Sequence, residues 1–488
     1  MDNLSQKTIS GLAYKLAERV GVQAVNFIVS IILARILMPE DYGTIALVTV
    51  FITILDVFVT YGFGNSLVVN KKSDDLDFST CFLFGLCLAL VIYAGVFFAA
   101  PAIASHYQLP ILVPVIRVMA LRIPIAAINS VQHAYVQKHM IFRKFFISTS
   151  IGTISSGIIA VIMAYCGCGL WALVTQYLGN VLIDTICLSF IVAWKPKFIF
   201  SFQRLKIIYD YGWKILVGGL IDTGYSQLKN FVIADRYSRQ DLAFYTRGDS
   251  FAQMGMTAIE PAVDGVVFPA LSNCNDDIPT MKSMTRKLIK CTTYIVFPIF
   301  FLIMSVSESL VLILIGEKWL EAVPYVAIGC LALFFRPVQI INNCVIKASG
   351  RSDMFLKLDI IKKSIGIALL FLAIPYGVKA IALSIVVVNL ISTVINIWPN
   401  RKLLGYGYRE QFMDVVPNLI ISVLMAACVW LVSLLPINNI YLMFLSQVIV
   451  AIVVYFILSV VSRSESYSMI KVKATDILKS QIGRKRNG

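Results

Sequence analysis

The sequence predicts an all-α polytopic membrane protein with about 14 transmembrane helices, because about that many apolar runs are long enough to span a bilayer. Composition is the first reason: 58% of the 488 residues are hydrophobic and only 14% are charged, unlike ordinary soluble domains. The second is the recurrence of apolar runs of about 20 residues. The third is an internal repeat, which predicts two six-helix lobes in a pseudo-two-fold relation, followed by two extra C-terminal helices.

The apolar runs are predicted to be helices, because they lack the alternation of polar and apolar residues that marks the strands of a membrane barrel. We expect spans near residues 10–36, 42–63, 78–104, 110–134, 145–166, 168–194, 209–236, 243–270, 288–315, 321–347, 355–376, 378–400, 414–435 and 438–461.

Basic residues gather in alternate connections between these spans. The segments 138–144 and 195–206 are rich in Lys and Arg, whereas 101–110 and 165–169 contain neither. This is the positive-inside pattern, and it predicts that both termini are cytoplasmic. It also accounts for the net charge of +15 without nucleic acid as a partner.

The repeat is clearest where the stretch 26–44 recurs at 226–245, so that Asp41 corresponds to Asp241. With six spans per copy, the two copies have the same orientation, and we expect a site between them near the middle of the membrane. The predicted domains are an N-lobe at 1–200, a C-lobe at 201–405, two additional helices at 406–462 and a basic cytoplasmic tail at 463–488.

Polar side chains follow one face of several predicted spans, where each charge costs about 2.5–3.5 kcal/mol on insertion scales. The candidates are Arg19, Gln23 and Asn26 in the first span, Asp56 in the second, Arg122 in the fourth, Lys214, Asp222, Tyr225 and Lys229 in the seventh, Gln253, Glu260 and Asp264 in the eighth, and Arg336 in the tenth.

Two interpretations of these polar residues stay open. The charges could pair with one another as structural glue, for example Asp222 with Lys229 or Asp56 with an arginine. Alternatively, they line a wet cavity, which we favour for the set as a whole. Because Arg and Lys are in excess, such a cavity suits an anionic ligand with phosphate-like oxygens.

The sequence offers little for catalysis. It contains no P-loop, no H-E-x-x-H motif, no nucleophile elbow and no dinucleotide fingerprint. Cys166 and Cys168 form a C-x-C in a predicted turn without further ligands nearby. No loop is long enough for the outside domain that a membrane glycan polymerase or ligase would need. We therefore expect no enzyme, no cofactor and no metal site.

Several short motifs carry a resemblance to a known family. They are Thr8-Ile-Ser-Gly11, Leu33-Ala-Arg-Ile-Leu37 with Tyr42-Gly43, Tyr61-Gly-Phe-Gly64, Val267-Phe-Pro-Ala-Leu271, Gly316-Glu-Lys-Trp319 and Lys347-Ala348. In order and spacing, to about residue 460, the chain resembles the polysaccharide-transport flippases of the O-antigen and colanic-acid type. These are a branch of the multidrug/oligosaccharidyl-lipid/polysaccharide exporter superfamily.

The resemblance implies two six-helix lobes, two extra helices and a central cleft lined by spans 1, 2, 7 and 8. It also implies a bacterial inner-membrane protein that carries an undecaprenyl-diphosphate-linked oligosaccharide from the cytoplasmic to the periplasmic leaflet. Membrane lipids, a glycan polymerase and assembly proteins are the implied partners, and the implied state is a monomer.

We interpret the candidate residues in these terms, with transport by alternating access. Arg19, Arg122, Lys214, Lys229 and Arg336 would hold the diphosphate, while Gln23, Asn26, Tyr225 and Gln253 would bind sugar hydroxyls. Either the membrane potential or an ion carried by Asp56, Asp222, Glu260 or Asp264 would drive transport. An ion-coupled exporter of drugs or small solutes, from the same superfamily, stays open as the alternative.

Overall fold

The structure, a computed structural model, describes residues 21–61, 63–69, 73–257, 260, 267–275, 277–469 and 471. All regular elements within these residues are helices, which confirms the predicted all-α class. Ten of the described helices are long and apolar enough to cross a membrane, so the number 14 stays a prediction. Arg19 and Asp264 lie outside the described residues.

The chain divides into two compact units, Met1–Ala243 and Phe244–Gly488. The lobe boundary expected at residue 200 stays a prediction. The first unit contains a helix at Gly21–Ile36, α2 (Pro39–Thr60), α3 (Phe63–Val69), α4 (Asp75–His106), α5 (Leu112–Ala120), α6 (Arg122–Lys138), α7 (Phe142–Tyr165), α8 (Leu170–Ile191), α9 (Phe202–Arg236) and the start of α10 (Arg239–Thr257).

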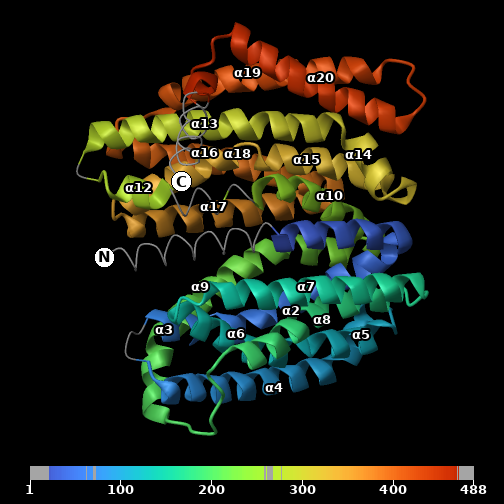
Figure 1. Ribbon diagram of the computed structural model, residues 1–488, viewed down its shortest axis with the longest axis vertical. Helices are drawn as coiled ribbons and strands as arrows, with labels where there is room; N and C mark the ends of the chain where they lie inside the picture. Colours follow the sequence, from blue (N-terminus) through green and yellow to red (C-terminus); the bar gives the residue numbers. More distant parts are fainter. Residues whose placement is uncertain are drawn as a thin grey trace, which may run out of the picture. The chain divides into compact units, whose positions relative to one another are not determined.

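Within this unit, α7 and α8 form an antiparallel pair, and α6 packs against α2, α4 and α8 (Figure 1). One aromatic group in the core joins α4, α6 and the segment after α8: the ring of Phe78 lies 5.6 Å from Tyr135 and 5.8 Å from Trp194. Asp74 starts α4 with a capping box, because its carboxylate accepts from Asp77 N–H and the Asp77 carboxylate accepts from Asp74 N–H.

Among its described residues, the second unit contains the rest of α10, nine further α-helices and two short 3₁₀ helices. They are α12 (Phe268–Ser272), α13 (Ile278–Ser305), α14 (Ser307–Leu314), η2 (Glu317–Ala322), α15 (Val323–Leu333), α16 (Arg336–Ala348), α17 (Ser352–Ala373), η3 (Ile374–Tyr376), α18 (Val378–Leu403), α19 (Tyr408–Ser433) and α20 (Ile440–Val461).

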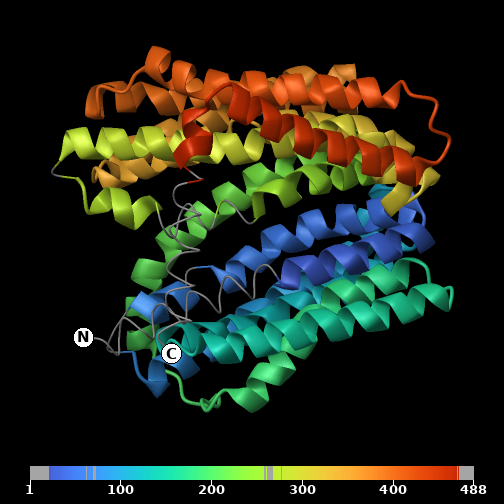
Figure 2. The same ribbon diagram turned by 45° about the horizontal axis from the view of Figure 1, so that its top comes forward.

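In this unit α16 packs against α13 and α18, and α19 and α20 lie side by side at one edge (Figure 2). The stacked rings of Phe297 and Phe334, 3.9 Å apart, tie α13 to the end of α15. Along α19 and α20 many large apolar side chains are exposed, among them Leu431 and Ile452. Such a continuous exposed apolar face suits hydrocarbon rather than water.

Most of the polar side chains predicted to follow one helix face lie on helices that are not both long and apolar enough to cross a membrane. The helix Gly21–Ile36 is short, and α9, α10 and α17 are not among the ten candidates. Charged residues explain this for α9 and α17, which contain Lys214, Lys229, Lys362 and Lys363. Charge at membrane depth is costly unless it has partners or water, so these helices need polar surroundings.

Two predicted spans are interrupted in the structure. The predicted span 110–134 is α5 and α6, which are separated at Leu121, and the span 321–347 is η2, α15 and α16, with a break at 334–335. A proline follows each break closely, Pro124 and Pro337. Proline has no N–H to donate to the carbonyl four residues earlier, so it weakens the helix ladder at this point.

Candidate functional site

In each interrupted span, an arginine is the first residue of the helix that follows the break. Arg122 begins α6 in the first unit, and Arg336 begins α16 in the second. Interrupted helices in corresponding places of two repeats are a pointer to a transporter's binding site. A positive side chain at a helix N-terminus is disfavoured by the helix dipole, so each arginine needs an acidic partner.

In the first unit, that partner is Asp56 on α2. Arg122 Nε donates to Asp56 Oδ2 at 2.7 Å, and its guanidinium lies 4.5 Å from the ring centre of Tyr177 on α8. The side chains of Arg122 and Asp56 are 24% and 12% exposed. The pair therefore ties three helices together in a setting with little water.

In the second unit, the partner is Glu260, and Arg336 Nε donates to its Oε1 at 2.8 Å. This pair is more open, with side-chain exposures of 43% and 37%. The contact uses Nε alone, so Glu260 does not occupy the two terminal nitrogens of the guanidinium. Both units thus hold the same kind of pair at the same place in the repeat.

These pairs bear on the two interpretations that the sequence left open. Asp56 is paired with an arginine, as the structural interpretation expected, and Glu260 is paired in the same way. Half-exposed Arg336 shows that pairing and access by a ligand are compatible. The roles of these residues in holding an anion or carrying an ion stay predictions.

The other predicted site residues are spread over several helices. Gln23 and Asn26 are half-buried on the helix Gly21–Ile36, and Gln253 is exposed on α10. On α9, Lys214 and Asp222 are exposed, while Tyr225 and Lys229 are half-buried. Lys214 and Lys229 are four helical turns apart, or roughly 22 Å at 1.5 Å per residue, so they do not converge on one phosphate.

The structure adds a group that the sequence analysis did not single out. Lys362 and Lys363 lie in the middle of α17 beside Asp359, and Lys362 donates to Asn396 on α18. The signal was present in the sequence, since three charged residues at helical spacing fall inside the predicted span 355–376.

A buried acid in the first unit was also missed. Asp184 on α8 is 6% exposed at its side chain, and its Oδ2 lies 3.0 Å from His133 Nε2. Asn129 Nδ2 donates to the same oxygen at 2.8 Å. Asp184 Oδ1 has no hydrogen-bond partner among the described residues. His133 alone gave no signal, because its partner lies on another helix.

We expect Asp184→Ala to destabilise the protein by about 1–3 kcal/mol, because it leaves the Asn129 amide and the His133 imidazole without their shared acceptor. Thermal unfolding of the detergent-solubilised protein measures the effect. Asp184→Asn keeps the volume and one oxygen acceptor, so it should lose less. Equal stability of the alanine variant and the wild type would contradict a structural role for this cluster.

The repeated stretches at 26–44 and 226–245 each contain a turn, and the two turns contact each other; we call this turn the repeated turn motif. Gln240 Nε2 donates to Glu40 Oε1, and Arg239 Nη1 donates to Thr44 Oγ1 at 3.1 Å. Glu40 and Gln240 occupy the same place in the two copies of the motif. A residue that meets its own counterpart is the signature of a two-fold contact. Contact between the two turns therefore gives Glu40 a structural role.

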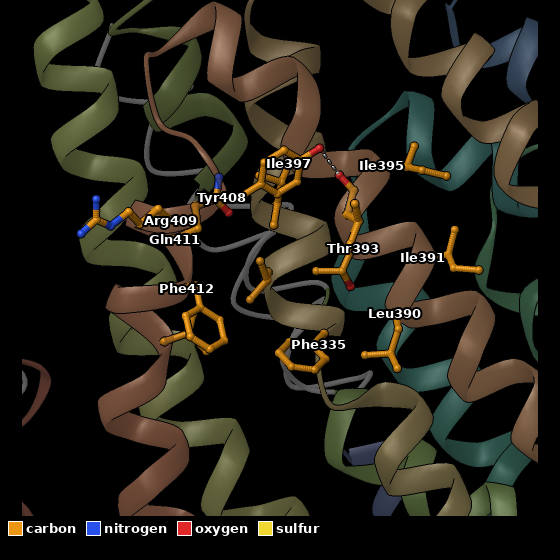
Figure 3. A pocket seen from close by; sticks show the side chains of 13 residues that line it. Phe335, Leu390, Ile391, Thr393, Ile395, Ile397, Tyr408, Arg409, Gln411 and Phe412 are labelled. Atoms are coloured by element: carbon orange, nitrogen blue, oxygen red, sulfur yellow. Dashed lines mark hydrogen bonds between the residues drawn. The ribbon is translucent and has the colours of Figure 1, made fainter.

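An apolar groove of about 640 Å³ lies in the second unit, lined by residues of α16, α18 and α19 together with Phe335. Figure 3 shows Phe335, Leu390 and Phe412 at its wall and the Arg409 side chain directed away from them. Two hydroxyls of the lining are hydrogen-bonded within the protein: Thr393 Oγ1 donates to the Asn389 carbonyl and Tyr408 Oη donates to the Val394 carbonyl. The groove suits hydrocarbon and offers no polar ligand site.

The described residues include no group of three His, Cys, Asp or Glu side chains that could hold a metal ion. The polar groups described above are ion pairs, amides and an imidazole. Such groups can bind and release an anion by exchanging hydrogen bonds and charge, without a covalent step.

Comparison with known proteins shows that the chain is similar to polysaccharide biosynthesis proteins. A family model described as "Polysaccharide biosynthesis protein" matches residues 32–324. The succinoglycan biosynthesis transport protein ExoT of Rhizobium meliloti (strain 1021) is 25% identical over 331 residues, which are 68% of this chain and 67% of that protein. The lipopolysaccharide biosynthesis protein WzxC of Escherichia coli (strain K12) is 22% identical over 435 residues, 86% of this chain and 88% of that one.

Solved structures show the same fold. The lipid II flippase MurJ, in an inward closed conformation, aligns with a TM-score of 0.76 at 14% identity, covering 93% of this chain and 99% of that one. An inward-facing multidrug resistance MATE family transporter of the MOP superfamily aligns at 0.63, with 14% identity and coverage of 81% and 94%. At these identities the likeness concerns the fold alone. Because the family model spans more than half of the chain, this protein belongs to the polysaccharide biosynthesis protein family, as the motifs in the sequence indicated.

Proposed function

We propose that the protein is a flippase that moves an undecaprenyl-diphosphate-linked oligosaccharide from the cytoplasmic to the periplasmic leaflet of a bacterial inner membrane. The observation that carries the proposal is the arginine–carboxylate pair at an interrupted span in each unit. Family membership and the names of the relatives support the substrate class.

The arginines supply the chemistry that a diphosphate needs. A guanidinium presents a planar fork of N–H donors that matches two phosphate oxygens. In each unit the carboxylate neutralises the arginine until the anion arrives. When the substrate binds, its phosphate oxygens neutralise part of the arginine's charge. The cost of holding charge in the membrane is then shared between protein and substrate rather than added.

The remaining residues fit subsidiary roles in the same scheme. Lys214, Lys229 and Arg19 would attract the anion, and Gln23, Asn26, Tyr225 and Gln253 would bind sugar hydroxyls. We place both termini in the cytoplasm and keep the lobes at 1–200 and 201–405, with access alternating between the two leaflets. Synthesis enzymes and a glycan polymerase are the expected neighbours, and the acting species is a monomer without catalytic activity.

Two energy sources suit this arrangement. A diphosphate with about two negative charges gains up to about 2.3 kcal/mol per charge per 100 mV when it moves outward. Alternatively, Asp56 or Glu260 takes a proton when its arginine turns to the substrate, which couples transport to a proton gradient. Asp222 and Asp264 are the further candidates for an ion. Transport that survives collapse of the proton gradient at constant potential would exclude the proton as the coupling ion.

The distribution of the lipid-linked glycan between leaflets tests the function. In cells that lack the gene, we expect complete lipid-linked units to accumulate in the cytoplasmic leaflet, with loss of surface glycan. Restoration by the wild-type gene is the control. Complete units in the outer leaflet would place the defect after flipping. Normal surface glycan with altered efflux of cationic dyes would favour the solute exporter, although Glu260, its best acid, is paired with Arg336.

A further inference from the structure

The basic cluster on α17 is the strongest unassigned feature of the second unit. Lys362 and Lys363 are 12% and 18% exposed at their side chains, and both lie at the middle of a 22-residue helix. At 1.5 Å per residue, each is about 15 Å from either helix end. Lysines near the ends of a membrane helix can reach the interface, but these two are too far from both ends.

One carboxylate serves both lysines. Asp359 Oδ2 lies 2.8 Å from Lys363 Nζ, while Asp359 Oδ1 lies 3.7 Å from Lys362 Nζ. The spacings i to i+3 and i to i+4 put all three on one face of α17. Lys362 therefore has the longer and weaker share of this acid, and its nearest polar contact is the Asn396 Oδ1 atom at 3.1 Å.

Beyond Asp359, the Asn396 amide oxygen and the Phe355 ring, the groups that act on Lys362 are cations. The positive charges of Arg336 and Lys363 both act on Lys362. Asn396 is 1% exposed, and its Nδ2 has no hydrogen-bond partner within the described part of the chain. An unpaired buried donor costs about 1–3 kcal/mol. The cluster thus presents an unsatisfied donor and like charges in one place.

An anion with several oxygens resolves all of these features. It would accept from Asn396 Nδ2, lie between the like charges of Lys362 and Arg336, and use the terminal guanidinium nitrogens that Glu260 does not occupy. A metal ion would do the opposite, because it would add positive charge beside three cations. The chemistry of the site therefore selects an anion such as phosphate or diphosphate.

We propose that Lys362, Lys363 and Asn396, together with Arg336, form the subsite that holds the diphosphate of the lipid-linked substrate in the second unit. The assignment rests on the proposed function and adds α17 and α18 to the set of binding helices. In the first unit, the corresponding Arg122 has an aromatic ring beside it, that of Tyr177. The second unit thus adds two lysines and a buried amide to the contacts that its arginine offers to the phosphates.

Binding of a defined lipid tests the subsite. The purified full-length protein is placed in nanodiscs of neutral lipid, and its affinity for undecaprenyl diphosphate is measured. The double variant Lys362→Gln/Lys363→Gln should bind about 10- to 100-fold more weakly, because it loses two charge-assisted contacts. Lys362→Arg/Lys363→Arg keeps the charges and should retain most of the affinity.

Two further variants separate the site from general effects of charge. Lys357→Gln removes an exposed lysine from the same helix and should bind like the wild type. Asn396→Asp has nearly the same volume but replaces a donor with a negative charge, and it should weaken binding at least as strongly as the double glutamine variant. Elution as a single monodisperse species and an unchanged unfolding temperature verify that each variant is folded.

The outcomes distinguish the subsite from the function. Wild-type affinity in the double glutamine variant overturns the subsite and leaves the flippase proposal intact. Equal affinity of the wild type for undecaprenyl diphosphate and for phosphatidylglycerol also overturns it, since the cluster would then be a general anionic-lipid site. If deletion of the gene leaves the glycan leaflets unchanged while the lysine variants still lose diphosphate binding, the function fails and the anion site stands.

Discussion

Replacing Arg122 with alanine is expected to abolish transport and to lower the free energy of unfolding by about 3 kcal/mol, because it leaves the Asp56 carboxylate in a nearly dry setting without a counter-charge. Asp56 is 12% exposed at its side chain and its contact with Arg122 is 2.7 Å long. Thermal unfolding in detergent measures stability, and the leaflet assay measures transport. Wild-type stability in Arg122→Ala would contradict the pairing.

A double variant separates the structural role of this pair from its role in transport. Asp56→Leu/Arg122→Met replaces both charges with apolar groups of similar volume, which is often neutral or stabilising for a buried ion pair. We expect stability to return and transport to stay lost. Transport at the wild-type level in the double variant would mean that the pair has a structural role only and does not bind the substrate.

Gly43→Ala is expected to prevent correct folding, with a cost above the usual 1–3 kcal/mol for an overpacked site. A Cβ atom on Gly43 would lie 1.9 Å from the carbonyl oxygen of Arg239 and 2.6 Å from its carbonyl carbon. Both are backbone atoms at the start of α10, so no side-chain rotation can relieve the overlap. The contact between the turn motif and its repeat would have to open.

The matched control is Gly85→Ala on α4, where an added Cβ meets nothing within 4 Å. Alanine is favoured over glycine in a helix by about 1 kcal/mol, so this variant should be as stable as the wild type or slightly more so. Folded yield and unfolding temperature compare the two variants. A Gly43→Ala protein with normal yield and normal transport would contradict the close backbone approach.

Only one member of each Arg–acid pair could be predicted from the sequence. Arg122 and Arg336 could be placed in matching spans from the repeat alone. Their partners could not, because Asp56 and Glu260 are 66 and 76 residues away in the chain. Helical periodicity fixes the face on which a side chain lies, but it carries no information about which neighbouring helix meets that face.

Partners on neighbouring helices also distinguish the residues that the sequence did not point to. Lys362 lies on a charged face that was visible in the sequence, yet Asn396, the amide that makes this face a site, belongs to α18. His133 gains meaning from Asp184 on α8. Conversely, the polar residues from Lys214 to Lys229 on α9 were predicted to form one stripe, and its length of about four turns spreads the two lysines too far apart for one ligand.

The sequence by itself determined the helical membrane class, the internal repeat, the family and the positions of the two arginines. These follow from local rules, since hydrophobic length sets the spans and short motifs set the turns. Tertiary structure alone decided which carboxylate neutralises each arginine and where a buried donor lacks a partner. Those features depend on helix packing, in which side chains distant in sequence must share charge and hydrogen bonds because little water reaches them.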